Sequence, residues 1–389
     1  MPSIFLKKNE DRRIRKGHLW VFSNEIAKID GELQNGEVAE LYDHNKEYLG
    51  SGFYNKNSLI SLRLLGSAYE GDIPAYIKHS LRQAYSLRKQ LYPHRDSFRL
   101  CFSESDLLPG LIIDKYNNTF VLQVYCFGMY VNLEHVISFL KDELGAENIF
   151  TRNDHYFRKL EGLPEEDNLY HGEAVNELID DGKIKFNINF SSSQKTGFYF
   201  DQCDNREFIE KISRGKTVLD AFCNSGGFGI HASFGGAGFV TFVDSSETEI
   251  TNAENNFAFN NCTAENDFIV MDVFDYFGKC IDAGRKFDIV MIDPPAFAKS
   301  RKSIPAALKG YAKLNKMALS CVGKDGYLVT SSCSHHITQT DFLESVVTGA
   351  SKAGKNLQLV HYNSASLDHP SLPAMDETTY LKFAVFKVI

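Results

Sequence analysis

The feature that most constrains the fold is an alternation of short apolar runs and amphipathic stretches that begins near residue 205. The apolar runs lie at 217–222, 239–244, 267–271, 287–292 and 326–331. The stretches 248–260 and 308–320 between them have the apolar periodicity of helices. Strands that are buried on both faces and joined by crossover helices predict an α/β fold with a doubly wound, Rossmann-like parallel sheet.

The first part of the chain has a different pattern. Short strands expected at 37–42, 48–54 and 59–64 are separated by turn residues, which predicts a small β-barrel over residues 1–70. A central α+β domain is expected over 71–180.

That central domain is expected to begin with a helix at 73–91. It would continue with strands at 110–114 and 119–125, a helix at 132–144 and a strand at 148–152. A strand pair, 169–178 with 183–189, is expected to form a β-hairpin at the start of the third domain, which covers 181–389.

Composition excludes several other classes of protein. A chain of 389 residues is too long for one ordinary core. It has no apolar run of the roughly 18–20 residues that a membrane span needs, and its charged N-terminus is unlike a signal peptide. Its eight cysteines form no C-x-x-C pair, so we expect reduced thiols, no metal site and a cytoplasmic protein.

The first strand of the C-terminal domain runs into a glycine turn that indicates a nucleotide-ligand loop. Asp220 near its end is followed by Phe222, Asn224, Gly226, Gly227 and Phe228. Glycine allows close backbone approach, and the N-terminus of the next helix offers unpaired N–H groups. Residues 227–232 also satisfy a loose dinucleotide fingerprint, which leaves a nicotinamide enzyme open. The carboxylate of Asp220 would repel a pyrophosphate and would favour the ammonium of S-adenosylmethionine.

Two further acids end the next two strands. Asp244, followed by Ser245, is placed to accept the ribose hydroxyls, and Asp272, followed by Val273, is placed to meet the adenine amino group. Each of these acids has an alternative role as the N-cap of the following helix.

The fourth and fifth strands end in residues that suggest methyl transfer to a base. Asp293-Pro294-Pro295 follows the fourth strand, and the two prolines stiffen the backbone where an active-site loop would begin. Cys333 follows the fifth strand, shortly before a helix for which Thr338 or Thr340 is a candidate cap. Such a position favours a reactive thiolate, whereas the alternative is an inert buried cysteine.

The net charge of −8 does not suggest a nucleic-acid partner, but the positive charge is concentrated in two runs. Residues 1–20 contain six basic and two acidic residues, and residues 299–316 contain six basic residues and no acid. A solvated surface is the alternative interpretation of either run. The candidate RNA-binding residues are Arg12, Arg13, Arg15, Lys16, Lys299, Arg301 and Lys302.

These motifs resemble class I methyltransferases, and most closely the large-subunit ribosomal RNA cytosine-C5 methyltransferases of the RlmI-like group. Residues 15–22 resemble the start of that family's RNA-binding PUA domain, and residues 106–114 resemble its central domain. Residues 195–202 resemble its cofactor-lid segment, which implies that Phe198, Phe200, Asp201 and Gln202 bind the cofactor. The resemblance extends to Asp293-Pro294-Pro295 and Ser332-Cys333-Ser334.

The resemblance implies an S-adenosylmethionine-dependent enzyme that forms 5-methylcytosine in 23S ribosomal RNA. Cys333 would add to C6 of the base and Asp293 would act at N3. One alternative is methylation of a purine or exocyclic amine, with Phe297 stacking on the base. Another is a non-catalytic RNA-binding factor. Homodimer formation is left open.

Overall fold

The computed structural model describes residues 1–174, 176–190, 197–298 and 300–389. The chain divides into two compact units. The N-terminal unit comprises Met1–Gly182, Ile188–Phe200 and Leu367–Thr378, and the C-terminal unit comprises Lys183–Asn187, Asp201–Ser366 and Thr379–Ile389. None of the helices in the described ranges has both the length and the apolar character needed to cross a membrane.

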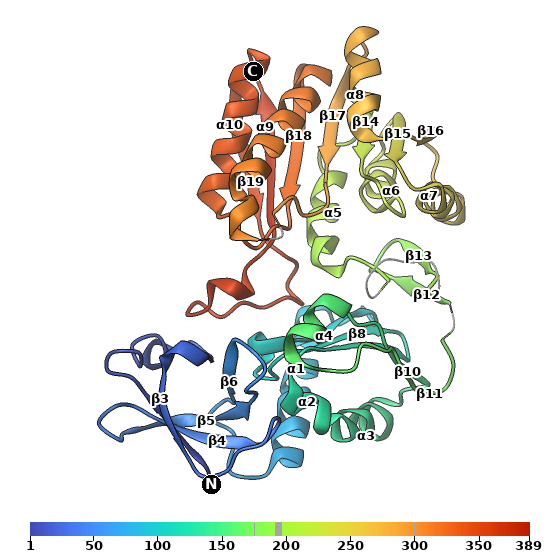
Figure 1. Ribbon diagram of the computed structural model, residues 1–389. Coiled ribbons are helices and arrows are strands. Elements are labelled where there is room, and N and C mark those ends of the chain that lie inside the picture. Colours follow the sequence, from blue (N-terminus) through green and yellow to red (C-terminus); the bar gives the residue numbers. More distant parts are fainter. Residues whose placement is uncertain (175, 191–196, 299) are drawn as a thin grey trace. The chain divides into compact units, whose positions relative to one another are not determined.

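The N-terminal unit begins with a six-stranded sheet in the order β2-β6-β5-β4-β1-β3 (Figure 1). Its strands are β1 (Ser3–Leu6), β2 (Trp20–Phe22), β3 (Ile26–Asp30), β4 (Val38–Tyr42), β5 (Tyr48–Tyr54) and β6 (Ile60–Leu64). Neighbouring strands are antiparallel except for β1 and β4, which are parallel. Buried side chains such as Ile4, Val21 and Leu62 form its core. The three strands predicted here agree with β4, β5 and β6 to within one residue.

A five-stranded sheet follows in the order β11-β10-β9-β8-β7. Its strands are β7 (Phe98–Phe102), β8 (Leu111–Tyr116), β9 (Thr119–Val124), β10 (Asn148–Thr151) and β11 (Leu169–His171). The helices of this block are α1 (Ile73–Leu91), α2 (Phe127–Val131), α3 (Leu133–Leu144) and α4 (His155–Glu161). Helix α1 begins where Asp72 accepts a hydrogen bond from the N–H of Ala75, so its predicted start is confirmed.

A buried ion cluster joins the two sheets of this unit. Arg63 of β6 donates to Glu104 at 2.7 Å and to Glu161 of α4 at 2.9 Å, and the indole N–H of Trp20 donates to Glu104 at 2.7 Å. All three charged side chains are buried, so removing one member would leave the others without compensation. The cluster links residues on both sides of position 70 within this unit.

The strand predicted over residues 169–178 is wrong as a single element. It divides into β11 and β12 (Glu177–Asp180), and β12 pairs with β13 (Lys185–Ile188) in a two-stranded sheet. Gly172 has a φ of 64°, in the left-handed region that ends a strand. A Cβ at this position would lie 2.1 Å from the carbonyl oxygen of Glu147, so the chain turns where only glycine fits.

The C-terminal unit contains a seven-stranded sheet in the order β16-β15-β14-β17-β18-β20-β19 (Figure 1). Its strands are β14 (Thr217–Ala221), β15 (Phe239–Asp244), β16 (Glu265–Val270), β17 (Phe287–Ile292), β18 (Val322–Ser332), β19 (Leu357–Asn363) and β20 (Lys382–Val388). The first five are parallel, as predicted. Strand β20, which was not predicted, is antiparallel to both β18 and β19.

Helices cover this sheet in two groups (Figure 1). The helices are α5 (Cys203–Glu210), α6 (Gly227–Phe234), α7 (Glu247–Phe259), α8 (Val273–Asp282), α9 (Ile304–Cys321) and α10 (Gln339–Ala353). Helices α8, α9 and α10 share one apolar core with the sheet, while α6 packs against α5 and α7. The predicted doubly wound sheet is confirmed.

Short 3-10 helices occur in both units. They are η1 (Ile14–Lys16), η2 (Ser23–Glu25), η3 (Ser103–Asp106), η4 (Phe200–Gln202), η5 (Arg301–Ser303) and η6 (Asp376–Thr378).

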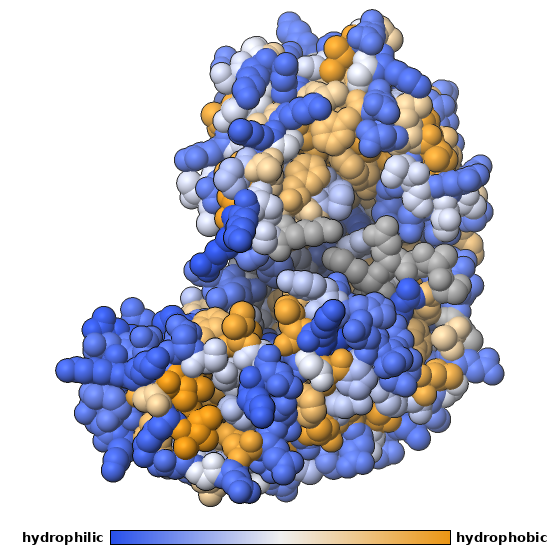
Figure 2. Space-filling model, viewed as in Figure 1, coloured by the Kyte–Doolittle hydropathy of each residue, from blue (hydrophilic) through white to orange (hydrophobic). Residues whose placement is uncertain are grey.

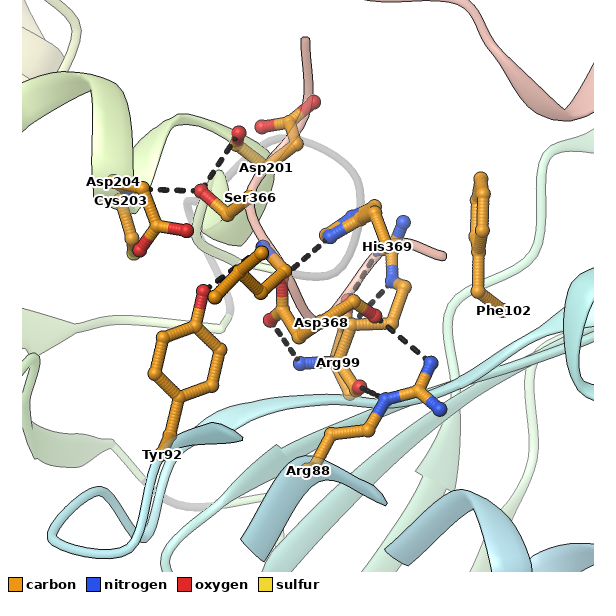
Figure 3. Close-up of polar contacts among 12 residues, drawn as sticks. Arg88, Tyr92, Arg99, Phe102, Asp201, Cys203, Asp204, Ser366, Asp368 and His369 are labelled. Atoms are coloured by element: carbon orange, nitrogen blue, oxygen red, sulfur yellow. Dashed lines mark hydrogen bonds and ion pairs between the residues drawn. The ribbon is translucent and has the colours of Figure 1, made fainter. Parts of the chain in front are cut away.

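Between β19 and β20 the chain leaves the C-terminal unit, and Leu367–Thr378 belongs to the N-terminal unit; we call this segment the strap. Figure 3 shows Asp368 and His369 of the strap beside Arg88 and Arg99. The carboxylate of Asp368 accepts the N–H of Arg99 at 2.8 Å, and its carbonyl accepts the guanidinium of Arg88 at 2.9 Å. Within the N-terminal unit, the strap is therefore held by buried charged groups.

Candidate active site

The parallel strands bring the predicted acids and the predicted thiol to one edge of the C-terminal sheet. Asp272, Asp244, Asp220, Asp293 and Cys333 lie at the carboxyl ends of β16, β15, β14, β17 and β18, which are consecutive in the sheet. The strand order reverses between β14 and β17, where open α/β sheets bind their ligands. The structure thus places the four candidate acids and the candidate nucleophile at one edge.

The loop after β14 has an unusual backbone. Phe222, Asn224 and Gly226 have φ values of 64°, 48° and 87°, and two of these residues carry a Cβ that disfavours this conformation. The N–H of Asn224 donates to Asp244 at 3.1 Å, so the acid that ends β15 holds the loop in place. Backbone strain that is stabilised in this way is typical of ligand-binding loops.

Asp220 is buried below this loop. Its carboxylate accepts the N–H of Gly229, in the first turn of α6, at 2.7 Å. Burial is the main cause that raises the pKa of Asp220 to about 7; the charges of Asp293 and Asp244 act in the same direction, against the hydrogen bond from Gly229 and the charge of Arg206. A carboxyl group kept in such a position is suited to a cationic ligand, because a cation would restore its negative charge.

Arg206 of α5 is a site residue that the sequence analysis missed. Its guanidinium lies over the ring of Phe228, 5.8 Å from the centroid, and lowers the pKa of both Asp220 and Asp293. A Cβ on Gly227 would lie 2.6 Å from Nε of Arg206, so this glycine makes room for the cation. No sequence motif marks Arg206, because α5 precedes the first strand of the sheet.

Asp293 is held by residues from two other segments. Ser331 of β18 donates to one carboxylate oxygen, and the side-chain amide of Gln202 donates to the other at 3.2 Å. Burial raises the pKa of Asp293 to about 6, against the lowering effect of Ser331. After it, Pro294 is buried and Pro295 is exposed. The structure therefore brings the predicted residues Gln202 and Asp293 together.

Asp201 offers an unused hydrogen-bond acceptor at this site. Its Oδ2 accepts the hydroxyl of Tyr380 at 2.6 Å, whereas its buried Oδ1 has no hydrogen-bond partner among the described residues. Its main-chain carbonyl accepts the hydroxyl and the N–H of Ser366, a contact drawn in part in Figure 3. An unpaired buried oxygen beside Gln202 fits a ligand that carries an ammonium group or hydroxyls.

The alternative role as a helix N-cap holds for Asp272 but not for Asp244. Asp272 is the N-cap of α8 and accepts the N–H of Phe274 at 2.8 Å. Asp244 is not a cap, because Ser246 caps α7, and its Oδ1 accepts the N–H of Ser246 at 3.0 Å. Ser245 is exposed. Val273 lies in the apolar core, so only its backbone is left to face a ligand.

The predicted lid segment falls in both units. Phe198 and Phe200 belong to the N-terminal unit, where the ring of Phe200 lies 5.1 Å from that of Tyr116 and the N–H of Phe198 donates to the Tyr116 hydroxyl. Asp201 and Gln202 belong to the C-terminal unit. Lys195 and Thr196, also in the predicted lid, lie outside the described residues.

Cys333 lies immediately after β18, in a turn that is held by hydrogen bonds to Tyr311 of α9. The hydroxyl of Tyr311 accepts a hydrogen bond from Ser332 at 2.9 Å and lies 3.0 Å from the hydroxyl of Ser334. Ser334 also accepts the N–H of Ala298 at 3.2 Å. The residues on both sides of the thiol are thereby tied to one tyrosine, which the sequence analysis missed although it lies in a helix predicted at 308–320.

Burial distinguishes Cys333 from most other thiols of the chain. Six of the eight cysteines are buried, and Cys333 and Cys262 are half-buried. Burial raises the pKa of several of these thiols, including those of Cys126, Cys223 and Cys262, which keeps them protonated. Of the two candidate caps of α10, Thr338 caps the helix and accepts the N–H of Asp341 at 3.1 Å, whereas Thr340 lies within the helix. Next to Cys333, the exposed His335 stacks on Tyr380 with the ring centroids 5.0 Å apart.

Some side chains of the two basic runs form ion pairs within the fold, and others are exposed to solvent. Arg13 donates to Glu25 at 2.6 Å, and Arg15 contacts Asp11, Asp43 and Glu47 at 2.5–3.0 Å. These two arginines therefore stabilise the local fold. Hydrophilic residues dominate the visible surface (Figure 2). The remaining candidates that the structure describes are exposed: Arg12, Lys16, Arg301 and Lys302. Lys299 lies outside the described residues.

The chain matches two family models and full-length relatives. Residues 4–67 match a PUA-like domain, and residues 167–387 match the S-adenosylmethionine-dependent methyltransferases. The chain is 34% identical over 397 residues to Ribosomal RNA large subunit methyltransferase I of Aliivibrio fischeri, covering 100% of this chain and 99% of the relative. The protein of the same name from Aeromonas salmonicida is 34% identical over 390 residues, covering 99% and 98%.

The fold is also similar to a solved structure. The crystal structure of SMU.776 complexed with SAH superposes with a TM-score of 0.86 at 20% identity, covering 100% of each chain. The methyltransferase match favours S-adenosylmethionine over the nicotinamide cofactor that the glycine loop left open. The PUA-like match covers most of the six-stranded sheet, and the methyltransferase match covers most of the seven-stranded sheet. The chain belongs to the Ribosomal RNA large subunit methyltransferase I family and is an S-adenosylmethionine-dependent methyltransferase.

Proposed function

We propose that this enzyme methylates C5 of a cytosine in large-subunit (23S) ribosomal RNA, with Cys333 as the nucleophile. The observation that carries the proposal is the position of a half-buried thiol directly after β18, beside β17, the strand that Asp293 follows. The relatives named above supply the RNA class, because their names specify large-subunit ribosomal RNA.

The residues at the edge of the sheet would hold S-adenosylmethionine. Asp220 and the free oxygen of Asp201 suit its ammonium group, and Asp244 suits the ribose hydroxyls. Asp272 uses one carboxylate oxygen as a helix cap, which leaves the other for the adenine amino group. When bound, S-adenosylmethionine supplies the sulfonium methyl group that C5 of the cytosine takes up.

The protein residues would prepare the cytosine for this reaction. C5 is a weak nucleophile until the thiolate of Cys333 adds to C6, which forms a carbon–sulfur bond and turns the ring into an enamine. The pKa of Asp293 is raised to about 6, and in its protonated form the carboxyl group would donate a hydrogen bond to N3 of the cytosine. Loss of the C5 proton to a base would then expel the thiolate, so that the carbon–sulfur bond breaks and Cys333 is regenerated.

The rest of the chain would bind the RNA. We propose a PUA-like RNA-binding domain over residues 1–70, a central domain over 71–180 and a methyltransferase domain over 181–389. Arg12, Lys16, Arg301 and Lys302 are the exposed cations best suited to phosphate contacts. The target base would be unstacked to reach Cys333. A ribosomal substrate would place the reaction in the cytoplasm. Light scattering would show whether the enzyme works as a homodimer.

Replacing the thiol tests the mechanism. Cys333→Ala should lower methylation of 23S ribosomal RNA by at least about 10³-fold, because without C6 addition the barrier at C5 is not reduced. Cys262→Ala, at the other half-buried thiol, should retain activity. Methylation is measured by transfer of labelled methyl groups, and S-adenosylmethionine binding by calorimetry confirms that both variants fold.

A substrate analogue tests the covalent step separately. RNA that carries 5-fluorocytosine should form a stable adduct with the wild-type enzyme, since fluorine at C5 cannot leave as a proton does. Mass spectrometry should place the adduct on Cys333. Methylation that persists at the normal rate in Cys333→Ala, without an adduct in the wild type, would show that another base atom is modified.

A further inference from the structure

A buried lysine lies across from the strand end that carries Cys333. Lys382 begins β20, and the antiparallel register pairs it with Ser332, the residue before the thiol. Only 4% of Lys382 is exposed, although lysine side chains are normally kept in contact with water. The burial of a charged amine at this place requires a partner or a function.

The ammonium of Lys382 is directed at the turn that contains Cys333. Its Nζ donates to the carbonyl oxygen of Ser334 at 2.7 Å and to that of Tyr380 at 2.7 Å. Both acceptors are neutral, so these hydrogen bonds fix the position of the ammonium without cancelling its charge. Burial lowers the pKa of Lys382 to about 8, against the opposite effect of the charge of a Cys333 thiolate.

We propose that Lys382 is a positioning residue for Cys333: it holds the turn through the Ser334 carbonyl, and its positive charge stabilises the thiolate. A cation beside a cysteine favours the deprotonated thiol, which is the nucleophilic form. The proposal deepens the function proposed above, because it takes Cys333 as the reacting group. It concerns only charge and position, so it can be tested without RNA.

Other titratable groups also lie near this pair. Tyr311 of α9 interacts electrostatically with Cys333, and burial raises its pKa, which keeps the phenol neutral near pH 7. Asp293, after β17, accepts a hydrogen bond from Ser331 of β18, the strand that Cys333 follows. His335 and Tyr380 stack on each other next to the turn. Each of these groups is unchanged when only Lys382 is replaced, so a comparison of variants isolates the effect of the ammonium.

The pH dependence of thiol alkylation tests the proposal. The full-length protein is treated with iodoacetamide between pH 6 and 9.5, and peptide mass spectrometry reports the rate at Cys333. In Lys382→Met the midpoint should rise by about one pH unit or more, which makes alkylation at pH 7 roughly tenfold slower. Lys382→Arg should restore most of the wild-type midpoint, because it keeps the charge.

Lys387→Met is the matched control. Lys387 lies on the same strand and also donates to a backbone carbonyl, that of Asp325, but its ammonium lies over the ring of Tyr327. This variant should leave the Cys333 midpoint unchanged. An unchanged midpoint in a folded Lys382→Met protein would overturn the proposal, as would an equal shift in Lys387→Met.

A reciprocal measurement applies even if Lys382→Met does not fold. Cys333→Ser keeps the size of the side chain, but its hydroxyl does not ionise in the pH range in which Lys382 titrates. Competitive acetylation followed by mass spectrometry should then give a lower pH midpoint for Lys382 than in the wild type, and an equal midpoint would contradict the proposal. If alkylation and acetylation show the coupling while Cys333→Ala still methylates RNA, the proposed function fails and only the electrostatic coupling between Lys382 and Cys333 stands.

Discussion

At the level of single residues, the candidate active site concentrates acidic side chains, and burying a carboxylate such as Asp220 opposes folding. Asp220 is buried, and its pKa is raised to about 7 from an ordinary value of 3.8. Above that pH the folded protein holds a desolvated negative charge that the unfolded chain exposes to water. The cationic ligand proposed for this site would relieve that charge, so binding and stability are in conflict at Asp220 until the cofactor is bound.

Asp220→Asn should therefore stabilise the protein without cofactor at pH 8. Because the folded pKa lies above the unfolded value, the protonated carboxyl contributes its full stability below pH 3.8 and loses it as the pH rises through about 7. The raised pKa corresponds to an upper limit of roughly 4 kcal/mol at pH 8 and almost none near pH 4. Asparagine can still accept the N–H of Gly229.

Calorimetry at both pH values measures this difference. The surface variant Asp282→Asn, at an exposed residue at the end of α8, is the control and should change the free energy of unfolding little at either pH. Binding of S-adenosylmethionine to Asp220→Asn should be weaker than to the wild type. A lower melting temperature for Asp220→Asn than for the wild type at pH 8 would argue against a destabilising, desolvated carboxylate at this site.

At the level of secondary-structure elements, helix α6 is held unusually close to the sheet. A Cβ on Gly229 would lie 2.2 Å from the ring of Phe242 on β15, and Phe242 is itself packed between Phe257 and Phe268. The close approach brings the N–H of Gly229 to Asp220. The glycines of this motif thus have separate tasks: Gly226 turns the loop, Gly227 makes room for Arg206, and Gly229 sets the distance between helix and strand.

Gly229→Ala should destabilise the C-terminal unit by about 1–3 kcal/mol, because the added methyl group overpacks a core that cannot move aside. It should also weaken binding of S-adenosylmethionine, since the first turn of α6 would shift away from Asp220. Denaturant unfolding and calorimetry measure the two effects.

Gly278→Ala is the matched control for this prediction. Gly278 lies within α8, and a Cβ there would have no atom within 4 Å. Alanine should therefore stabilise that helix by about 0.5–1 kcal/mol. Equal effects of the two substitutions would show that the contact with Phe242 does not limit the position of α6.

At the level of the whole molecule, the chain passes from one unit to the other more than once. The strap is anchored in the N-terminal unit through Asp368, and its flanking residues Ser366 and Tyr380 both bond to Asp201 in the C-terminal unit. Although burial raises the pKa of Asp368, the charge of His369 and the hydrogen bonds outweigh it, and the net effect is a lowered pKa.

Asp368→Ala should cost about 3–5 kcal/mol of stability, because it leaves buried partners unpaired. The sign of the pH dependence follows from the lowered pKa: the contribution of Asp368 is present above pH 3.8 and is lost as the pH falls through the folded value. The wild type should therefore lose its advantage over the variant in acid. Thermal unfolding at pH 3 and pH 7 measures this change.

Limited proteolysis gives a second measurement for the strap. Cleavage within residues 367–378 should be faster in Asp368→Ala than in the wild type. Asp376→Asn, at an exposed residue of the same strap, should behave like the wild type. Equal cleavage of all three proteins would show that Asp368 does not anchor the segment.

Periodicity and motif spacing were enough to specify the C-terminal sheet and the position of most site residues along it. Apolar runs separated by helices specify parallel strands, and the carboxyl ends of parallel strands share one edge. For that reason Asp220, Asp244, Asp293 and Cys333 could be placed together from their positions in the chain. The cysteine pattern and the basic runs were also evident, although local ion pairs now account for Arg13 and Arg15.

The groups that surround those residues depend instead on tertiary packing. Arg206, Tyr311 and Lys382 come from helices or strands that no motif connects to the site, and their charges and hydroxyls act through contacts between distant segments. Strand β20 is the clearest case, because an antiparallel strand inserted beside β18 brings Lys382 next to a thiol 49 positions earlier in the chain. Periodicity describes which side of an element is buried, but pairing between distant elements depends on the whole fold.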